Sequence, residues 1–491
     1  MNDYPMYIDG GFCEASDGGR FDSVNPATGL VWATAPAATE EDVDRAVRAA
    51  RRALHEGEWA TMTPTQRGKV LFRLADLVEE HAEILGSVET TDSGKLAVET
   101  RGQSAYVAEY YRYYAGLADK IQGATLPIDK PDMHVYTLAE PIGVVAGIVP
   151  WNAEMLLTAT KAAPALAAGN TVVIKSSEEA PAPVLEFARL VDQAGFPPGV
   201  FNLITGFGEP CGRALTSHPL VSRVSFTGGA DTARHVVVNT ANNFAHLSLE
   251  LGGKSPILIF DDADLGGAVN GAVAGNFGAS GQSCVAGSRV FVQSGIYADF
   301  IDEVVKRAEA VRIGDPLDAD TQMGPLATRE QRDRAEAVIA ESIAQGATLH
   351  TGGRRPDGFD AGWYFEPTLL ACPDQDIRST RVELFAPVMS ALKFETEEEG
   401  IALANDTEFG LGSGVFTQNL ARAHRVARAI HSGIVWINTY RAISPVSPFG
   451  GFGQSGYGRE AGLDVMHEYT RTKAVWVNTS QEPMANPFVM R

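Results

Sequence analysis

The sequence has few cysteines, and their spacing makes neither a metal site nor a disulfide framework. Cys13, Cys211, Cys284 and Cys372 are the only 4 among 491 residues, with no CxxC pair and no histidine at metal-ligand spacing. So low a number in so long a chain argues against a disulfide scaffold and indicates a reducing compartment. We therefore expect a cytoplasmic protein without a bound metal.

Positive charge and long apolar runs are also scarce. The chain has 40 Lys and Arg against 61 Asp and Glu, a formal net charge of -21. Such a surface disfavours binding to nucleic acid or to an anionic membrane. No apolar run reaches membrane-spanning length, and the N-terminus lacks the basic start and apolar core of a signal peptide. We expect neither a nucleic-acid partner nor a membrane partner.

What the chain does have is an alternation of short apolar runs and helical patterns. Val- and Ile-rich runs separated by helices are typical of a parallel sheet covered on both faces. A first series begins at residue 143 and a second near Lys254, and one more strand is expected at 471–480. The pattern predicts an α/β protein with two such domains, the first of the dinucleotide-binding type. Strands of the first series are expected at 143–150, 170–175, 201–206 and 221–229.

Cys284 lies between small residues in the segment GQSCVAGSR. A cysteine acts as a nucleophile when its thiolate is stabilised and accessible; attack on a carbonyl then requires donors for the oxyanion and a base to activate water. Glu250, in an apolar setting where burial would raise its pKa, is the candidate base, and Asn152, directly after an expected strand, is the candidate donor. Taken singly, each has a plainer interpretation: a core cysteine, a solvated carboxylate and a turn asparagine.

Three glycine-rich segments resemble phosphate-binding loops to different degrees. ELGGKSP lacks the first glycine of a P-loop, because Ser248 stands at that position. PFGGFGQSGYGRE opens no strand-to-helix unit, and we expect tight packing or a turn there. FTGGADTAR follows an expected strand and precedes an expected helix, so its backbone amides are a candidate pyrophosphate site, although its glycine fingerprint is incomplete.

Six segments occur together in the order VPWN, FTGG, LELGGKSP, GQSCVAGSR, ELFAPV and SPFGGFGQSGYGRE. In their order and spacing the chain resembles the NAD(P)-dependent aldehyde dehydrogenase superfamily, from IDGGF near the N-terminus to EYTRTKAV near the C-terminus. The resemblance implies an α/β, aldehyde dehydrogenase-like fold. A Rossmann-like coenzyme domain would comprise 1–120 and 143–249, and an α/β catalytic domain 250–465. A small β oligomerisation element would comprise 121–142 and 466–491.

The resemblance also assigns roles to residues. Cys284 matches the nucleophile that forms a thiohemiacetal and then a thioester. Asn152, with the Cys284 backbone N–H, matches the oxyanion donor, and Glu250 matches the base that activates water. The implied reaction is the NAD-dependent oxidation of an aldehyde to its carboxylic acid, in a homodimer or homotetramer.

The cofactor contacts are implied by the same match. Because Glu178 would repel a 2'-phosphate, we expect NAD, with NADP as the alternative. The expected contacts are Trp151, Lys175, Glu178, Phe226, Thr227, Gly228, Gly229, Gln331, Glu383 and Phe385.

The substrate tunnel departs from the family pattern. The family commonly continues PWNFP and carries an aromatic residue seven positions beyond that Phe, whereas this chain has Ala153 and Thr160 there. Loss of two rings predicts a wider tunnel that accepts a bulky or aromatic aldehyde; the alternative is that Tyr106 or Tyr110 refills the space. The expected tunnel residues are Tyr106, Tyr110, Ala153, Leu157, Thr160, Ser283, Val285, Arg441 and Ile443.

Two alternative functions stay open within the same superfamily. Arg441 could receive a substrate carboxylate, which would make the chain a semialdehyde dehydrogenase, or it could be a surface or interface charge. The other alternative is a dehydrogenase that passes its thioester to coenzyme A. Relatives of that kind generally lack the deacylating glutamate, and Glu250 is present.

Overall fold

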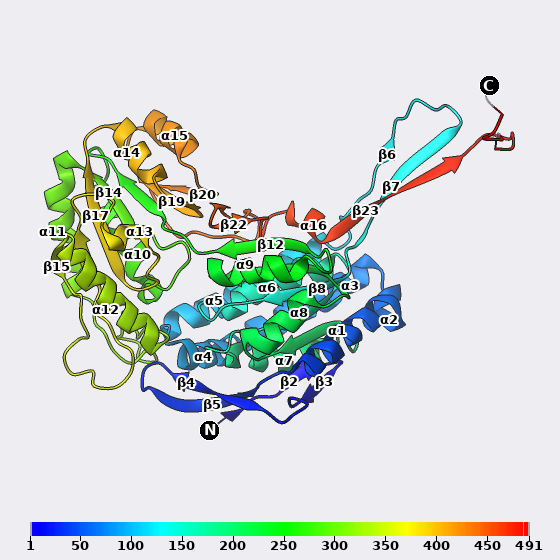
Figure 1. Ribbon diagram of the computed structural model, residues 1–491, viewed down its shortest axis with the longest axis horizontal. Coiled ribbons are helices and arrows are strands. Elements are labelled where there is room, and N and C mark those ends of the chain that lie inside the picture. Colours follow the sequence, from blue (N-terminus) through cyan, green and yellow to red (C-terminus); the bar gives the residue numbers. More distant parts are fainter. Residues whose placement is uncertain (1, 485, 490–491) are drawn as a thin grey trace.

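The computed structural model describes residues 2–484 and 486–489 and contains two large β-sheets (Figure 1). The larger sheet has the order β22-β12-β11-β8-β9-β10-β2-β3, and its five central strands, from β12 to β10, are parallel. Its strands are β2 (Met6–Ile8), β3 (Gly11–Cys13), β8 (Val144–Ile148), β9 (Thr171–Lys175), β10 (Phe201–Ile204), β11 (Val221–Gly228), β12 (His246–Leu251) and β22 (Gly456–Tyr457).

Helices cover both faces of this sheet, as the Val-rich strands predict. Val145 and Val172 pack into the apolar core beneath α3, α5, α6 and α7, whereas Val144 and Val173 pack into the core on the α1 face. The helices of this half are α1 (Glu40–His55), α2 (Gly57–Thr61), α3 (Pro64–Glu80), α4 (Ala82–Ser93), α5 (Ala97–Leu117), α6 (Glu154–Ala167), α7 (Ala182–Ala194), α8 (Arg213–Ser217) and α9 (Ala230–Thr240).

The second sheet has the order β15-β16-β17-β14-β13-β19-β20 and is parallel except at β15. Its strands are β13 (Pro256–Ile259), β14 (Arg289–Gln293), β15 (Thr348–Thr351), β16 (Thr368–Ala371), β17 (Val388–Phe394), β19 (Gly412–Phe416) and β20 (Ile434–Ile437). Its helices are α10 (Leu265–Phe277), α11 (Tyr297–Glu309), α12 (Arg329–Ala344), α13 (Arg378–Arg381), α14 (Glu397–Asn405) and α15 (Leu420–Ala429).

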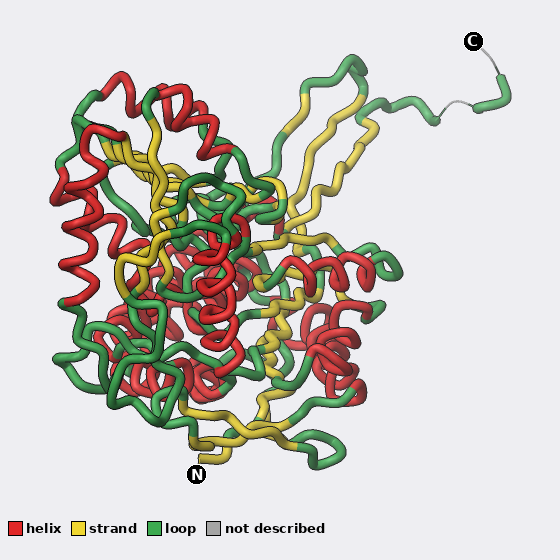
Figure 2. Tube along the Cα trace, turned by 60° about the vertical axis from the view of Figure 1, so that its left-hand side comes forward, coloured by secondary structure: helices red, strands yellow, loops and turns green. Residues whose placement is uncertain are grey.

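A three-stranded antiparallel arm extends from the body (Figures 1 and 2). The predicted C-terminal strand is present as β23 (Thr470–Asn478), which follows the short helix α16 (Val465–Glu468). It pairs along its whole length with β7 (Met133–Pro141), and β6 (Thr125–Leu126) pairs on the other side. Residues 485 and 490–491 of the predicted oligomerisation segment lie outside the described residues, and the domain boundaries and the role of the arm stay predictions.

Two small sheets complete the described chain. The first contains β1 (Asn2–Asp3), β4 (Arg20–Asn25) and β5 (Leu30–Pro36), and the second contains β18 (Phe409–Gly410) and β21 (Phe452–Gly453). Among residues 2–484 and 486–489, no helix has both the length and the apolar character needed to cross a bilayer.

Candidate active site

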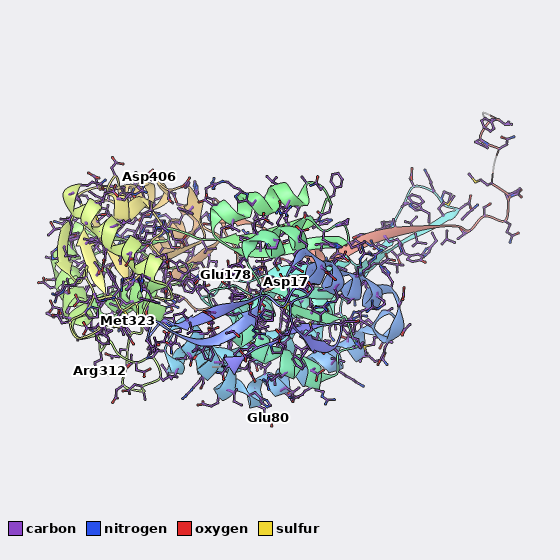
Figure 3. All side chains as sticks on the ribbon, turned by 60° about the horizontal axis from the view of Figure 1, so that its bottom comes forward. Asp17, Glu80, Glu178, Arg312, Met323 and Asp406 are labelled. Carbon is purple, nitrogen blue, oxygen red and sulfur yellow. The ribbon has the colours of Figure 1, made fainter. Side chains whose placement is uncertain are left out.

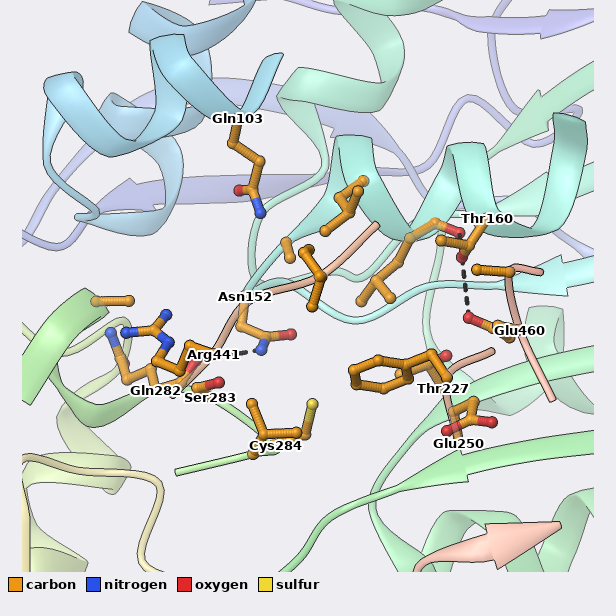
Figure 4. A pocket seen from close by; sticks show the side chains of 18 of the residues that line it. Gln103, Asn152, Thr160, Thr227, Glu250, Gln282, Ser283, Cys284, Arg441 and Glu460 are labelled. Carbon is orange, nitrogen blue, oxygen red and sulfur yellow. Dashed lines mark hydrogen bonds between the residues drawn. The ribbon is translucent and has the colours of Figure 1, made fainter. Parts of the chain in front are cut away.

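A cavity of about 360 Å³ brings together the three residues predicted to carry the chemistry. Cys284, Glu250 and Asn152 all line it, although they come from three separate parts of the chain (Figure 4). Asn152 follows β8, Glu250 lies in β12, and Cys284 lies in the loop before β14. Sites in α/β folds form at the carboxyl ends of parallel strands, which explains why Asn152 and Glu250 converge.

A strained turn holds Cys284 in place. Ala279, Ser280 and Gly281 have left-handed φ values of 52°, 53° and 72°, a conformation that costs roughly 1–2 kcal/mol for a residue other than glycine. The Ser280 hydroxyl donates to the Gly324 carbonyl at 2.9 Å, which anchors the turn. Strain of this kind persists only where surrounding contacts fix the backbone, and here it precedes the candidate nucleophile directly.

The surroundings of Cys284 favour the protonated thiol over the thiolate. Burial, followed by the nearby carboxyl groups of Glu383 and Glu250, raises the pKa of Cys284 to about 12. This differs from the stabilised thiolate that a nucleophile requires, because the wall of the cavity is largely apolar. Attack by this thiol on a carbonyl would require it to lose its proton, and Glu250 is a carboxyl group in the same cavity.

Asn152 is positioned by the same loop. Its Nδ2 donates one hydrogen bond to the Gln282 carbonyl at 3.1 Å. A side-chain amide nitrogen has two hydrogens, so one remains for an oxygen that binds beside Cys284. An amide fixed by the loop that holds the nucleophile is suited to stabilise an oxyanion.

Glu250 is a buried carboxyl group without a described hydrogen-bond partner. Neither of its oxygens receives a hydrogen bond from any residue in the described parts of the chain. Burial, and then the negative charge of Glu460, raises the pKa of Glu250 well above its usual value, as the sequence predicted. The glycine-rich segment packs closely here, since Gly450 faces a Glu250 oxygen and Gly456 approaches the backbone of Leu249, as expected for tight packing.

A second cavity, of about 530 Å³, lies at the carboxyl ends of β8, β9 and β11. Seven of the residues predicted to contact the cofactor line it: Trp151, Lys175, Glu178, Phe226, Thr227, Gly228 and Gly229. Thr227 lines both cavities, so the two adjoin at that residue. In Figure 3, Glu178 is labelled in the body of the molecule, away from the arm.

The residues of this second cavity fit a dinucleotide. Lys175 Nζ lies 3.4 Å from a Glu178 carboxylate oxygen, a pair suited to the two hydroxyls of a ribose. Gly229 is the N-cap of α9 and makes no side-chain cap, so no cap side chain competes for the first backbone N–H groups of the helix. Such a helix end binds a pyrophosphate.

The other three predicted cofactor residues lie outside both cavity walls. The Gln331 amide donates to the carbonyls of Leu384 and Phe385 at 2.8 and 2.5 Å, and the Phe385 ring meets Trp151 edge-on at 5.5 Å. Glu383 accepts a hydrogen bond from the Gly253 N–H at 3.0 Å, and burial raises the pKa of Glu383 to about 6. Gln331, in α12, thus holds the loop that contains Glu383 and Phe385. This loop reaches the second cavity through the contact of Phe385 with Trp151.

Most of the predicted tunnel residues line the first cavity. Tyr106 does not; its hydroxyl donates to the Ile443 carbonyl at 3.2 Å, and its ring meets Tyr110 edge-on. Tyr110 itself lies in the wall, so it fills part of the space that the two missing rings at positions 153 and 160 would occupy. The predicted tunnel residues that line the cavity are Tyr110, Ala153, Leu157, Thr160, Ser283, Val285, Arg441 and Ile443.

Comparison with known proteins identifies the family. The pattern described as "Aldehyde dehydrogenase family" matches residues 12–475. The chain belongs to the aldehyde dehydrogenase family. It is 54% identical over 492 residues to (Z)-2-((N-methylformamido)methylene)-5-hydroxybutyrolactone dehydrogenase of Acinetobacter baylyi, with 100% of each chain covered.

Solved aldehyde dehydrogenases share the fold. The NAD+ complex of aldehyde dehydrogenase from Bacillus cereus has a TM-score of 0.95 at 42% identity and covers 98% of this chain and 97% of that one. Betaine aldehyde dehydrogenase from Staphylococcus aureus, solved in complex with NAD+, has a TM-score of 0.97 at 40% identity and covers 99% and 97%. The predicted aldehyde dehydrogenase-like α/β fold is confirmed.

Two further residues of this aldehyde dehydrogenase site were not predicted. Lys161 and Glu460 form a buried ion pair beside Glu250, and Glu460 lines the cavity. Lys161 also donates to Thr227 at 2.7 Å, and Glu460 accepts from the Ser225 and Thr160 hydroxyls at 3.0 and 2.9 Å. The sequence of α6 gave only a partial signal, because a buried lysine requires a partner but nothing in the helix identifies Glu460 as that partner.

The raised pKa of Glu250 predicts how turnover depends on pH. Only the ionised carboxylate can accept a proton, so turnover should rise with pH over a range that lies above the usual titration range of a glutamate. Glu460→Gln removes the neighbouring negative charge that raises the pKa of Glu250, and the rise should therefore move to lower pH. Steady-state rates across this range test the expectation, with Leu420→Gln on the surface as the control. No shift, or a shift to higher pH, would contradict it.

Proposed function

We propose that this aldehyde dehydrogenase oxidises an aldehyde to its carboxylic acid through Cys284. The observation that supports the proposal most directly is the single cavity shared by a thiol, a carboxyl group without a described hydrogen-bond partner and an anchored amide. Each of the three meets one requirement of acyl chemistry: a nucleophile, a base and an oxyanion donor.

The residues act in sequence. Cys284 Sγ bonds to the carbonyl carbon, its proton passes to Glu250, and the resulting oxyanion is held by Asn152 Nδ2 and the Cys284 backbone N–H. NAD, when bound in the second cavity, supplies the acceptor for the hydride that leaves the substrate carbon. The acyl group then remains on Cys284 as a thioester. Glu250 gives the thiol proton up to solvent and then takes a proton from water, whose oxygen attacks the thioester. The C–S bond breaks as the carboxylic acid leaves, and the proton held by Glu250 returns to the Cys284 sulfur.

The cofactor proposed is NAD. The structures from Bacillus cereus and Staphylococcus aureus were solved with NAD+, and the fold they share with this chain supports the same cofactor here. Glu178 supports NAD over NADP, because its carboxylate faces the same cavity and would repel a 2'-phosphate.

Hydrolysis, rather than transfer to coenzyme A, is the proposed fate of the thioester. Glu250 is present, buried and in the same cavity as Cys284. Coenzyme A would itself supply the attacking thiol, whereas water requires a base to remove its proton. A carboxyl group kept in an apolar setting, with a raised pKa, is suited to that role.

A substrate with a sizeable body is proposed, as the wall of the first cavity is mainly apolar. Ala153 adds little bulk to that wall, although Tyr110 occupies part of it. The Acinetobacter baylyi relative is named for a substituted 5-hydroxybutyrolactone, which is larger than a short aliphatic aldehyde. A 5-hydroxybutyrolactone is in general the ring-closed form of an aldehyde that also carries a carboxylic acid, so the name also favours the semialdehyde alternative.

Assembly as a homodimer or homotetramer is proposed from family membership and from the arm. A cytoplasmic location is proposed from family membership. The arm exposes apolar side chains that a monomer would leave in water: Leu126, Leu138, Trp476 and Val477. Burial of such a surface against a second copy is a sufficient reason for association.

Removing the nucleophile and the base should give different kinetic signatures. Cys284→Ala should abolish NADH formation, because no thiohemiacetal can form. Glu250→Gln should slow steady-state turnover by about 10²- to 10⁴-fold, with acyl-enzyme accumulating as the thioester. Absorbance at 340 nm and mass spectrometry of the quenched enzyme measure both. Undiminished turnover in Glu250→Gln, or a wild-type enzyme that works only with coenzyme A, would refute the hydrolytic mechanism.

Adding a ring at position 153 should narrow substrate range. Ala153→Phe should lower kcat/KM for benzaldehyde by roughly tenfold or more, while acetaldehyde loses much less, because a ring in the wall displaces the larger substrate first. Leu420→Phe, at an exposed site, is the matched control. A wild-type preference for acetaldehyde would contradict the proposed substrate size.

The arm should determine the oligomeric state. Light scattering of the wild-type protein should give a mass of two or four chains, and Trp476→Asp should shift it toward one chain, because a charge is costly in an apolar interface. Leu420→Asp serves as the control. A monomeric wild-type protein would contradict the proposed assembly.

A further inference from the structure

Two glutamine side chains in the wall of the first cavity are held by their carbonyl ends. Gln103 lies in α5, and its Oε1 accepts a hydrogen bond from Lys95 Nζ at 2.6 Å. Gln282 lies in the turn before Cys284, and its Oε1 accepts a hydrogen bond from the Ala327 N–H at 2.8 Å. An ammonium group and a backbone N–H can only donate, so each amide must turn its oxygen toward that donor and its NH2 group away from it.

The NH2 groups of these two amides are placed to bind a ligand. Gln282 is 3% exposed, and its Nε2 has no hydrogen-bond partner among the described residues. In Figure 4 the nitrogen of Gln103 points into the cavity. A buried donor without a partner is costly, so an acceptor oxygen brought by a ligand would stabilise the complex.

A buried group of charged side chains behind the wall fixes the orientation of the Gln103 amide. Lys95 Nζ donates to Glu89 Oε1 at 2.8 Å, and both side chains are buried. Burial opposes the charge on the ammonium, but the carboxyl groups of Glu89 and Glu154 outweigh it and raise the pKa of Lys95 above its usual value. Lys95 therefore stays a donor, and the Gln103 oxygen stays turned toward it.

Carboxylates offset the positive charges of this wall. Glu89 pairs with Lys95, as described above. The Arg441 guanidinium lies so close to Gly278 that a Cβ there would overlap Nη1, while Glu99 accepts a hydrogen bond from the N–H of the next residue, Ala279, at 3.1 Å. Arg441 and Glu99 thus approach one turn with opposite charges. Donors without an excess of positive charge favour an uncharged acceptor over an anion.

We propose, on the basis of the proposed aldehyde oxidation, that Gln103 and Gln282 select aldehydes whose body carries an uncharged carbonyl oxygen, as in an amide. The aldehyde carbon lies at Cys284, and the carbonyl oxygen accepts a hydrogen bond from Nε2 of the glutamine that the length of the substrate reaches. The product is the carboxylic acid that retains this amide. The two glutamines determine which aldehydes are used and take no part in bond making.

The first test compares matched aldehydes with the wild-type enzyme. The N,N-dimethylamides of 4-oxobutanoic, 5-oxopentanoic and 6-oxohexanoic acid are each compared with the hydrocarbon aldehyde of the same shape, namely 4,5-dimethylhexanal, 5,6-dimethylheptanal and 6,7-dimethyloctanal. For at least one length, kcat/KM for the amide should exceed that for the hydrocarbon by about tenfold or more, because the hydrocarbon leaves the buried donor unpaired. If no amide is better than its hydrocarbon, the inference is refuted.

The free acids of the same three lengths test the charge of the bound group. At the preferred length, kcat/KM should be lower for the acid than for the amide, because the carboxylates beside Lys95 and Arg441 offset the positive charge that would attract an anion. An acid that exceeds its amide would show that this wall binds an anion, and it would overturn the inference.

The second test removes each donor and keeps the contact that holds the side chain. Gln103→Glu retains an oxygen for Lys95, and Gln282→Glu retains one for the Ala327 N–H, but each loses its NH2 group. The added carboxyl group will change the rates with all substrates, so the ratio of amide to hydrocarbon isolates the lost hydrogen bond. At least one of the two variants should reduce this ratio by about ten- to hundredfold.

A surface glutamine provides the matched control, and the outcomes separate the two proposals. Gln345 is exposed, its Oε1 likewise accepts a backbone hydrogen bond, from the Arg378 N–H at 2.7 Å, and Gln345→Glu should leave the ratio unchanged. Oxidation of both kinds of aldehyde with a ratio that neither Gln103→Glu nor Gln282→Glu lowers would refute this inference and leave the proposed function intact. Oxidation of no aldehyde by the wild-type enzyme would refute the proposed function itself.

Discussion

The buried ion pair of Lys161 and Glu460 determines the arrangement of the catalytic cavity. It joins α6 to a segment near the C-terminus, and the hydroxyls of Ser225 and Thr227 connect both to β11. Two charges taken out of water are stable only when each is paired and hydrogen-bonded, so separating these three elements would leave a buried charge without a partner. Because Glu250 lies beside the pair, the pKa of this proposed base depends on the charges of Glu460 and Lys161.

Burial accounts for the ionisation of the site. It raises the pKa of Cys284, of Glu250 and of Glu383, because each group loses more hydration in its charged form than in its neutral form. A neutral thiol and a neutral carboxyl cost less in an apolar wall than two anions side by side. The proposed chemistry therefore depends on the ionised form of Glu250, which alone can accept a proton.

The sequence predicted those parts of the site that lie in short continuous motifs. The expected strands could be predicted from their immediate neighbours along the chain, whereas Cys284 and Glu250 were singled out because their motifs resemble those of the aldehyde dehydrogenase superfamily. The pair of Lys161 and Glu460 could not, because its members lie in distant segments that meet only in the folded protein. The Thr160 hydroxyl was expected merely to leave space where a ring is missing, yet it donates to Glu460. Contacts of this kind depend on packing, which a local pattern does not contain.

The pairing of β23 with β7 makes β23 important for biosynthesis. During translation β7 emerges early, and one edge of it has no partner until the distant β23 is made. Exposed strand edges with apolar side chains readily pair with other chains. A ribosome that stopped just before β23 would release a polypeptide with every residue of the active site, and it would be lost to aggregation rather than to any defect in chemistry.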